Sequence, residues 1–327
     1  GTLPTVLMAT LSTFFAGRGQ TKLILLVNVL VTLVNVGLDY AWIFGHWGFP
    51  AAGSAGAARA TVASQAVGCA AYLAIIWGPT SRRAYRTLAG WRFDAGLFRR
   101  LLRFGMPTGF QFGIEISAFA LFLMIVGRIS TAALAASGIA FNLNMLVFMP
   151  MVGLGIGVSS LVGRYLGGDR PDLAERATWS AFQVSFAYMA LCSLAYLLLP
   201  GLLLAPYRAG SSAAAFAEVG EIATVLLRFV AFYSIFDMAS VIFSAGLKGA
   251  GDTAYPMRTT AVLAWVAMLG PAYVGCVLLP GGVYLAWSTA TAYVLLLGLL
   301  MLRRFRAGGW KSLRVIEPPA RPASPEP

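Results

Sequence analysis

The sequence predicts an all-α protein that crosses a membrane several times. Of its 327 residues, 59% are hydrophobic and only 11% are charged, and the mean hydropathy is +0.77. Apolar segments recur along the chain, and most are long enough to cross about 30 Å of hydrocarbon as a helix. Short loops that carry most of the basic residues separate these segments. These features argue against a globular enzyme with a soluble core.

Nine apolar segments are predicted to be membrane helices. The first is short, and because the chain opens on Gly1 with no basic flank before the segment, it is not a signal peptide but an incomplete span. We therefore expect the N-terminus to be truncated. In chain order the predicted spans are 3–16, 23–44, 55–77, 106–126, 134–162, 177–199, 222–245, 259–279 and 283–302.

The basic residues predict the orientation of these spans. Of the 24 lysines and arginines, all but Arg59, Arg128, Arg208 and Arg228 lie in alternate loops or in the C-terminal tail. An excess of basic residues marks the cytoplasmic side, so the C-terminus is expected to be cytoplasmic. The net charge of +12 would indicate nucleic acid for a soluble chain, but here membrane topology explains it. The bilayer, and not nucleic acid, is the expected partner.

One long hydrophilic connection divides the chain. Residues 78–103 contain seven arginines and separate three spans from six, so we predict a cytoplasmic linker between two domains, 1–77 and 104–302. The last segment, 303–327, ends in a proline-rich stretch and is predicted to be a disordered cytoplasmic tail.

A short repeat links the two domains. The sequence FFAGRGQT at 14–21 matches LKGAGDT at 247–253, with both glycines and the threonine shifted by the same 232 residues. In each copy one apolar span precedes the motif and another follows it. This shared context predicts a duplicated helical bundle.

Two acidic residues lie within apolar spans. Asp237 follows Tyr233 by one helical turn, so both side chains lie on one face of a helix. A carboxylate at the centre of a bilayer costs at least about 2.5–3.5 kcal/mol, which favours a functional role over a purely structural one. Glu115 lies on another span at about the same depth, roughly 12–14 Å from the cytoplasmic end. The two carboxylates can therefore share a cation or a proton.

Several motifs, taken in order, resemble the multidrug and toxic-compound extrusion (MATE) family of cation-coupled efflux transporters. The resemblance covers the chain up to about residue 302, and it lies in the order and spacing of the motifs. They are GRGQT at 17–21, NVGLD at 35–39, IFG at 43–45, GAARATVASQ at 56–65, GMP at 105–107 with Glu115, FMP at 148–150 through Gly163, GGD at 167–169, and GAGDT at 249–253 with Pro256.

The resemblance implies a two-lobe bundle of twelve helices. This chain then corresponds to the last three helices of the N-lobe and all six helices of the C-lobe, with three preceding helices missing. The position of Glu115 is often a glutamate in the family, and the Tyr233–Asp237 pattern is similar to that of sodium-coupled members. Asn142 is a weaker candidate for the same C-lobe site; an amide bonding across a helix interface explains it equally well.

The resemblance also implies a second cation site in the N-lobe. Similar proteins bind a cation with residues at the positions of Asn35, Asp39 and Thr61, together with an aspartate on the first helix. That helix is absent here, so we expect the site to be incomplete. Water at the nearby end of the span is an equally good explanation for Asp39.

The implied function is a cation-coupled antiporter, not an enzyme. It would export organic, cationic drugs or toxins by alternating access, as a monomer in a bacterial inner membrane. Its coupling ion would be Na⁺ or H⁺, with no other metal and no cofactor. One alternative is a lipid-linked saccharide flippase of the same superfamily, for which a cavity lined by arginines would argue. The other is a membrane-embedded enzyme, but the sequence has no Asp-rich metal motif and no His-Glu-x-x-His.

Overall fold

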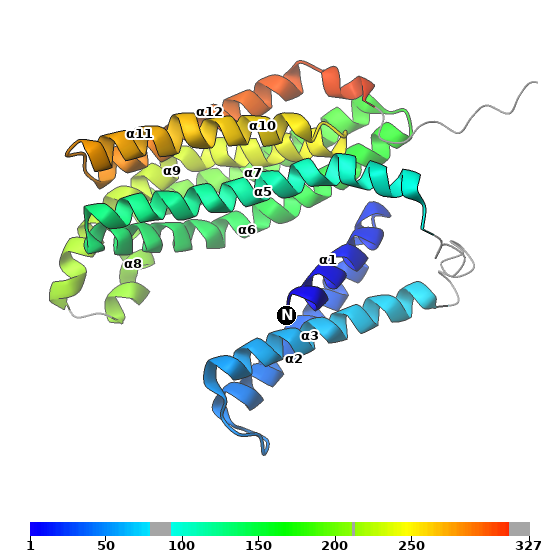
Figure 1. Cartoon of the computed structure of the whole chain (residues 1–327), viewed down its shortest axis with the longest axis horizontal. Helices are drawn as coiled ribbons and strands as arrows, with labels where there is room; N and C mark the ends of the chain where they lie inside the picture. Colours follow the sequence, from blue (N-terminus) through cyan, green and yellow to red (C-terminus); the bar gives the residue numbers. More distant parts are fainter. Residues whose placement is uncertain (79–92, 211–212, 314–327) are drawn as a thin grey trace, which may run out of the picture. The chain divides into compact units, whose positions relative to one another are not determined.

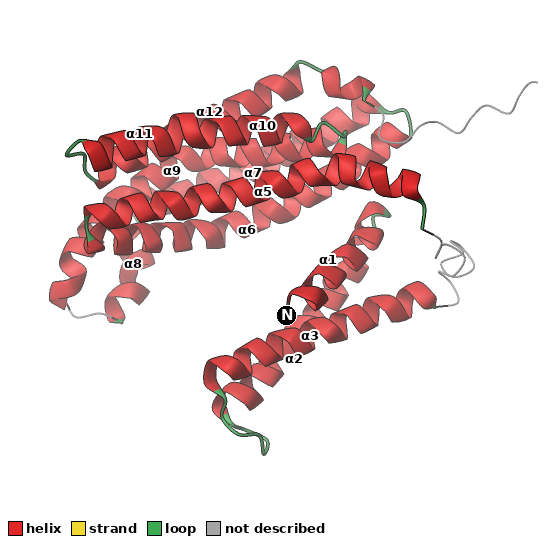
Figure 2. Ribbon diagram, in the orientation of Figure 1, coloured by secondary structure: helices red, strands yellow, loops and turns green. Residues whose placement is uncertain are grey.

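The computed structural model describes residues 1–78, 93–210 and 213–313. Helices make up nearly all of this part of the chain, which contains no strand (Figure 2). Eight of its helices are long and apolar enough to cross a membrane, and a ninth apolar helix, Thr2–Gly17, is shorter. The chain is therefore a multi-pass membrane protein, as predicted.

The helices divide into two compact units, residues Gly1–Ala95 and Gly96–Pro327 (Figure 1). The first unit contains α1 (Thr2–Gly17), α2 (Thr21–Phe44) and α3 (Gly53–Trp77). The second contains α5 (Ala95–Ile129), α6 (Thr131–Gly167), α7 (Pro171–Leu198), α8 (Pro200–Ala209), α9 (Ala213–Gly249), α10 (Ala254–Leu263), η1 (Ala264–Leu269), α11 (Gly270–Tyr273), η2 (Val274–Leu278), α12 (Val283–Arg306) and η3 (Gly309–Ser312).

The predicted linker is shorter than expected. Helix α5 begins at Ala95, so the last part of the segment 78–103 is helical. The sequence FRRLLRF at 98–104 combines arginines and leucines, which favour a helix. Residues 79–92 of the linker lie outside the described part of the chain.

In the first unit, α2 and α3 pack tightly in antiparallel directions. Gly56 lies so close to the carbonyl of Trp42 that an added Cβ would overlap it, and Gly68 lies against Val31. The aromatic rings of Phe15 on α1 and Tyr72 on α3 stack with centroids 5.3 Å apart, and both side chains are buried. Small residues thus let these helices approach closely where no hydrophobic force drives them together in lipid.

The repeated motif forms the same turn in both units. The amide of Gly19 bonds to the carbonyl of Ala16 at 3.0 Å, and the amide of Gly251 bonds to that of Lys248 at 3.0 Å. The next amides, of Gln20 and Asp252, reach back to Phe15 and Leu247 at 3.0 and 2.9 Å. Both second glycines have positive φ, +72° and +91°, as this type of helix end requires. The motif repeat therefore extends to backbone conformation.

Helix α9 is the centre of the second unit. It packs against α6, α7 and α12, and about half of its described side chains are buried (Figure 1). Gly249 at its end lies against the backbone of Ser159 on α6, and Gly298 of α12 lies against the carbonyl of Phe236. An added Cβ at either glycine would overlap that backbone. Glycine at these two positions therefore lets α9 pack closely against α6 and against α12.

One face of helix α5 borders open space. Gly105, Gly109 and Gly113 recur at every fourth residue, and a Cβ added at any of them would meet nothing within 4 Å. Helix α5 therefore leaves open space along the face that carries its glycines.

The span after α9 is not a regular α-helix. Two π-helical turns, η1 and η2, flank the short helix α11, which contains Pro271. The missing amide of a proline frees a carbonyl one turn earlier, and π-turns are one way to absorb such a defect.

The beginning of the predicted disordered tail is ordered. Helix α12 runs to Arg306, and Gly308 with φ +73° turns the chain into η3. Trp310 is fully buried, stacks on Phe305 at 4.8 Å and donates its indole N–H to the Phe305 carbonyl at 2.8 Å. Burial of this large side chain explains why residues 303–313 depart from the prediction; residues 314–327 lie outside the described part.

Candidate functional site

Glu115 lies near the middle of α5 and is half-buried. Its Oε1 accepts a hydrogen bond from Nε2 of Gln111, one turn earlier, at 2.8 Å. The same nitrogen lies 3.3 Å from the hydroxyl of Thr260 on α10. Gln111 and Thr260 are both buried, so this chain of contacts ties the carboxylate of α5 to a neighbouring helix.

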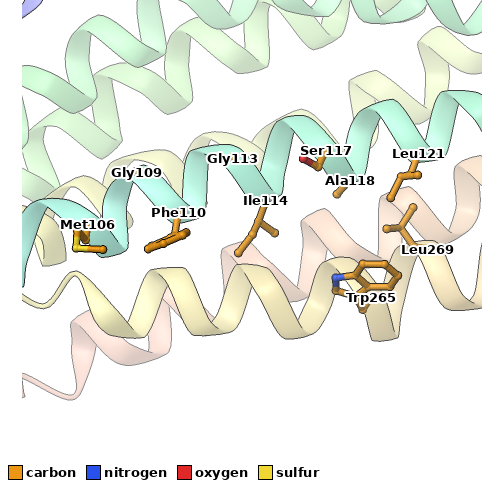
Figure 3. Close-up of a pocket in the computed structure, with 10 residues that line it drawn as sticks. All are labelled: Met106, Gly109, Phe110, Gly113, Ile114, Ser117, Ala118, Leu121, Trp265 and Leu269. Carbon is orange, nitrogen blue, oxygen red and sulfur yellow. The ribbon is translucent and has the colours of Figure 1, made fainter. Parts of the chain in front are cut away.

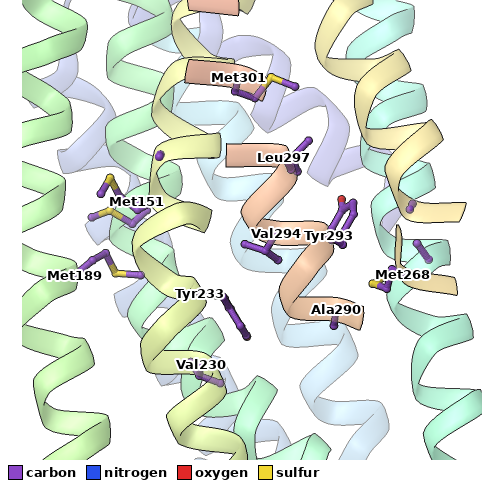
Figure 4. Close-up of a cluster of buried hydrophobic side chains, with 14 of the residues drawn as sticks. Met151, Met189, Val230, Tyr233, Met268, Ala290, Tyr293, Val294, Leu297 and Met301 are labelled. Carbon is purple, nitrogen blue, oxygen red and sulfur yellow. The ribbon is translucent and has the colours of Figure 1, made fainter. Parts of the chain in front are cut away.

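Asp237 and Tyr233 lie one turn apart on α9, the best-packed helix of the unit. Tyr233 is buried, and its ring stacks on Trp287 of α12 with centroids 6.5 Å apart. Figure 4 shows the Tyr233 ring directed from α9 toward α12. Asp237 is half-buried and forms no hydrogen bond with another described residue.

Three helices contribute to this region. The carboxyl groups of Glu115 and Asp237 lie close enough to interact electrostatically, and Tyr293 on α12 interacts with both of them. Tyr293 is itself buried (Figure 4). Lys248, near the end of α9, interacts with Glu115. The region thus combines two acids and two phenols from α5, α9 and α12, and Lys248 lies about three helical turns beyond Asp237 on α9.

Asn142 on α6 bonds to a different neighbour. Its Oδ1 accepts a hydrogen bond from the hydroxyl of Tyr207 on α8 at 2.7 Å. The Asn142 side chain is exposed. This bond joins two helices, as the structural interpretation of Asn142 expects, and its assignment to the cation site stays a prediction.

The candidate site in the first unit has orphaned polar atoms. Asn35 and Asp39 are half-buried on α2, and the buried atoms Nδ2 of Asn35 and Oδ1 of Asp39 have no hydrogen-bond partner among the described residues. Oε1 of Gln65 on α3 is also buried and has no hydrogen-bond partner among the described residues. Thr61 is exposed and donates its hydroxyl to Ala57 of its own helix at 3.0 Å. Unsatisfied amide and carboxylate groups of this kind are able to accept a further ligand.

The chemistry of the second-unit site fits a small hard cation or a proton. Carboxylate and phenol oxygens are the ligands that such cations prefer, and a proton can neutralise either acid. The described residues contain no cluster of three or more His, Cys, Asp or Glu side chains of the kind that holds a transition metal.

The sequence analysis missed Gln111 and Tyr293. Gln111 precedes Glu115 by four residues, the same spacing that singled out Tyr233, so this signal was present. Tyr293 stands in an apolar span with no charged neighbour, and only the packing of α12 beside α9 brings it to the acids.

Comparisons with known proteins give a consistent result. Residues 107–274 match the family model MatE. The probable multidrug resistance protein NorM of Mesorhizobium japonicum is 31% identical over 256 residues, which cover 78% of this chain and 55% of the relative. The protein of the same name from Thermotoga maritima is 27% identical over 319 residues, 97% of this chain and 66% of the relative. The chain thus spans between half and two thirds of the length of these relatives.

Solved structures show the same fold. A crystal structure of MATE in complex with MaL6 has a TM-score of 0.82 at 18% sequence identity. The match covers 93% of this chain and 66% of the chain in that structure. A MOP superfamily transporter from Pyrococcus furiosus, described as having a binding pocket of reversed polarity, has a TM-score of 0.76 at 20% identity. The match covers 86% of this chain and 61% of the chain in that structure. The predicted MATE-type helical bundle is therefore confirmed.

Proposed function

This chain belongs to the MatE family, and from that premise we propose that it forms the larger part of a cation-coupled transporter that exports organic compounds. Its relatives are named as multidrug resistance proteins. We place it in a bacterial inner membrane as a monomer, with its C-terminus in the cytoplasm, small organic cations as substrates, and no enzymatic activity or cofactor. The basic loops support this orientation.

The coupling site that we propose is the pair Glu115 and Asp237, with the hydroxyls of Tyr233 and Tyr293 as neutral ligands. The observation that supports it is that two half-buried acids on different membrane helices, α5 and α9, interact electrostatically. Two carboxylates that repel each other at mid-membrane depth gain most from one shared Na⁺ or one proton.

Coupling then follows from competition between two states. Ion and drug must favour opposite-facing conformations, because a ligand shifts an equilibrium only by its difference in affinity for the two states. An inward-moving unit charge gains about 2.3 kcal/mol per 100 mV of membrane potential, which can drive export. The orphaned polar atoms of Asn35 and Asp39 support a second ion position in the first unit.

The flippase alternative gains less support. An arginine-lined cavity does exist, but it lies at the start of α5, whereas the polar groups near mid-depth are acidic. An acidic centre attracts organic cations and repels anionic lipid-linked sugars.

The test is ion-driven efflux from vesicles that contain the complete protein. We expect an imposed Na⁺ or pH gradient to drive export of a fluorescent organic cation, and Glu115→Gln or Asp237→Asn to lower its rate at least about tenfold, because one charged ligand contributes roughly 1.5–3 kcal/mol. Glu218→Gln is the matched control, since Glu218 is exposed on α9. Normal efflux by both site variants at equal protein amounts would refute the assignment.

A further inference from the structure

An apolar groove runs along α5. Its cavity, about 580 Å³ in volume, lies between α5 and the segment that carries Trp265 and Leu269. Figure 3 shows Met106, Phe110 and Ile114 projecting from α5 toward that segment. Gly109 and Gly113 form part of the α5 wall, and an added Cβ at either would meet nothing within 4 Å. The groove therefore has both an apolar lining and free space.

A basic cavity adjoins this groove at the start of α5. It has a volume of about 780 Å³ and is lined by Arg99, Arg100 and Arg103, with Met257 of α10 also contributing. Met106 and Phe110 line both cavities, so the basic cavity and the apolar groove are continuous. Together they form one channel-like depression that is positively charged at one end and apolar along the rest.

Within the described part of the chain, no acidic side chain pairs with Arg99, Arg100 or Arg103. Two other basic residues of the unit do have partners: Arg304 pairs with Asp252 at 2.9 Å and Lys311 pairs with Glu175 at 2.5 Å. Arginine is the side chain best suited to bind a phosphate through paired N–H donors.

We propose that this depression binds one anionic phospholipid, with its phosphate on Arg99, Arg100 and Arg103 and an acyl chain along Gly109 and Gly113. From Met106 to Leu121 the groove is roughly 22 Å long, which exceeds the ~15 Å of hydrocarbon in one leaflet. A free phosphate would use the basic cavity alone. An organic cation would be repelled by the arginines.

The charge of the site is tested by native mass spectrometry of the full chain in detergent, titrated with palmitoyl-oleoyl phosphatidylglycerol. We expect this lipid to be retained in preference to phosphatidylcholine, and the triple variant Arg99→Gln, Arg100→Gln, Arg103→Gln to bind it at least about tenfold more weakly. The control removes three other arginines, Arg164, Arg170 and Arg176, which are exposed and lie outside the cavity. Equal loss in the control, or equal retention of phosphatidylcholine, would overturn the proposal.

The groove is tested separately. Gly109→Leu and Gly113→Leu fill it, and because leucine favours a helix over glycine they should not unfold α5. We expect each to weaken phosphatidylglycerol binding about tenfold, whereas Gly138→Leu on α6, where the added Cβ also meets nothing, should have no effect. Unchanged circular dichroism and elution volume establish folding. If the leucine variants retain the lipid fully, or if inorganic phosphate displaces it completely, the groove does not hold an acyl chain. The inference does not depend on the proposed transport function.

Discussion

At the scale of single residues, the acids were predictable and their neighbours were not. A charge within an apolar span is visible in the sequence, so Glu115 and Asp237 could be named from burial cost alone. Tyr293 could not, because an aromatic residue in a membrane span is ordinary and only the packing of α12 beside α9 brings it near the acids. Asp252 lies just before α10, yet it does not cap that helix and instead pairs with Arg304.

The hydroxyl of Tyr293 provides a residue-scale prediction. Tyr293→Phe keeps the ring and its packing but removes a neutral oxygen ligand beside the two acids. We expect the cation concentration that gives half-maximal efflux to rise about three- to tenfold, since one hydrogen-bonding group contributes roughly 0.5–1.5 kcal/mol. Tyr284→Phe is the control, because Tyr284 is exposed on the same helix. An identical ion dependence in both variants would remove Tyr293 from the site.

At the scale of helices, hydropathy predicted where the spans lie but not where they end. Helices α5 and α6 extend well beyond their apolar segments, because a helix continues into water wherever its residues still favour it. Hydropathy did not predict the short helix α8 or the ordered residues after Arg306. Each is stabilised by a few tertiary contacts, such as Tyr207 with Asn142 and Trp310 with Phe305, and such contacts leave no periodic pattern in the sequence.

The crossing of α9 and α6 gives an element-scale prediction. Gly249→Ala places a Cβ on the Ser159 carbonyl, so the helices must separate, and we expect unfolding in mixed micelles to become about 1–3 kcal/mol easier. Gly157→Ala on α6 meets nothing within 4 Å and should be neutral or stabilising by up to ~1 kcal/mol. If the two alanine variants are equally stable, the close approach does not contribute to stability.

At the scale of the whole molecule, the repeat was the most informative pattern. Two glycines and a threonine predicted a duplicated bundle, and the two turns share their backbone hydrogen bonds. What the repeat could not predict is how tightly each helix is packed, because that depends on the shapes of many side chains at once.

The difference between α5 and α9 leads to a prediction for the second unit. About half of the described side chains of α9 are buried and it packs closely at two glycine crossings, whereas α5 borders open space. Hydrogen–deuterium exchange of the protein in nanodiscs should therefore be faster in α5 around Gly105–Gly113 than in α9 around Phe236, because local opening is easier where packing is sparse. Faster exchange in α9 would contradict this picture.

The open space beside α5 also has a mechanical consequence for the coupling site that we propose. If Glu115 and Asp237 are both ionised in an empty site, they repel each other, and α5 has room to move on its glycine-bearing face. A bound cation would remove this repulsion and allow α5 to return. Ion occupancy would in this way be converted directly into force on a single helix.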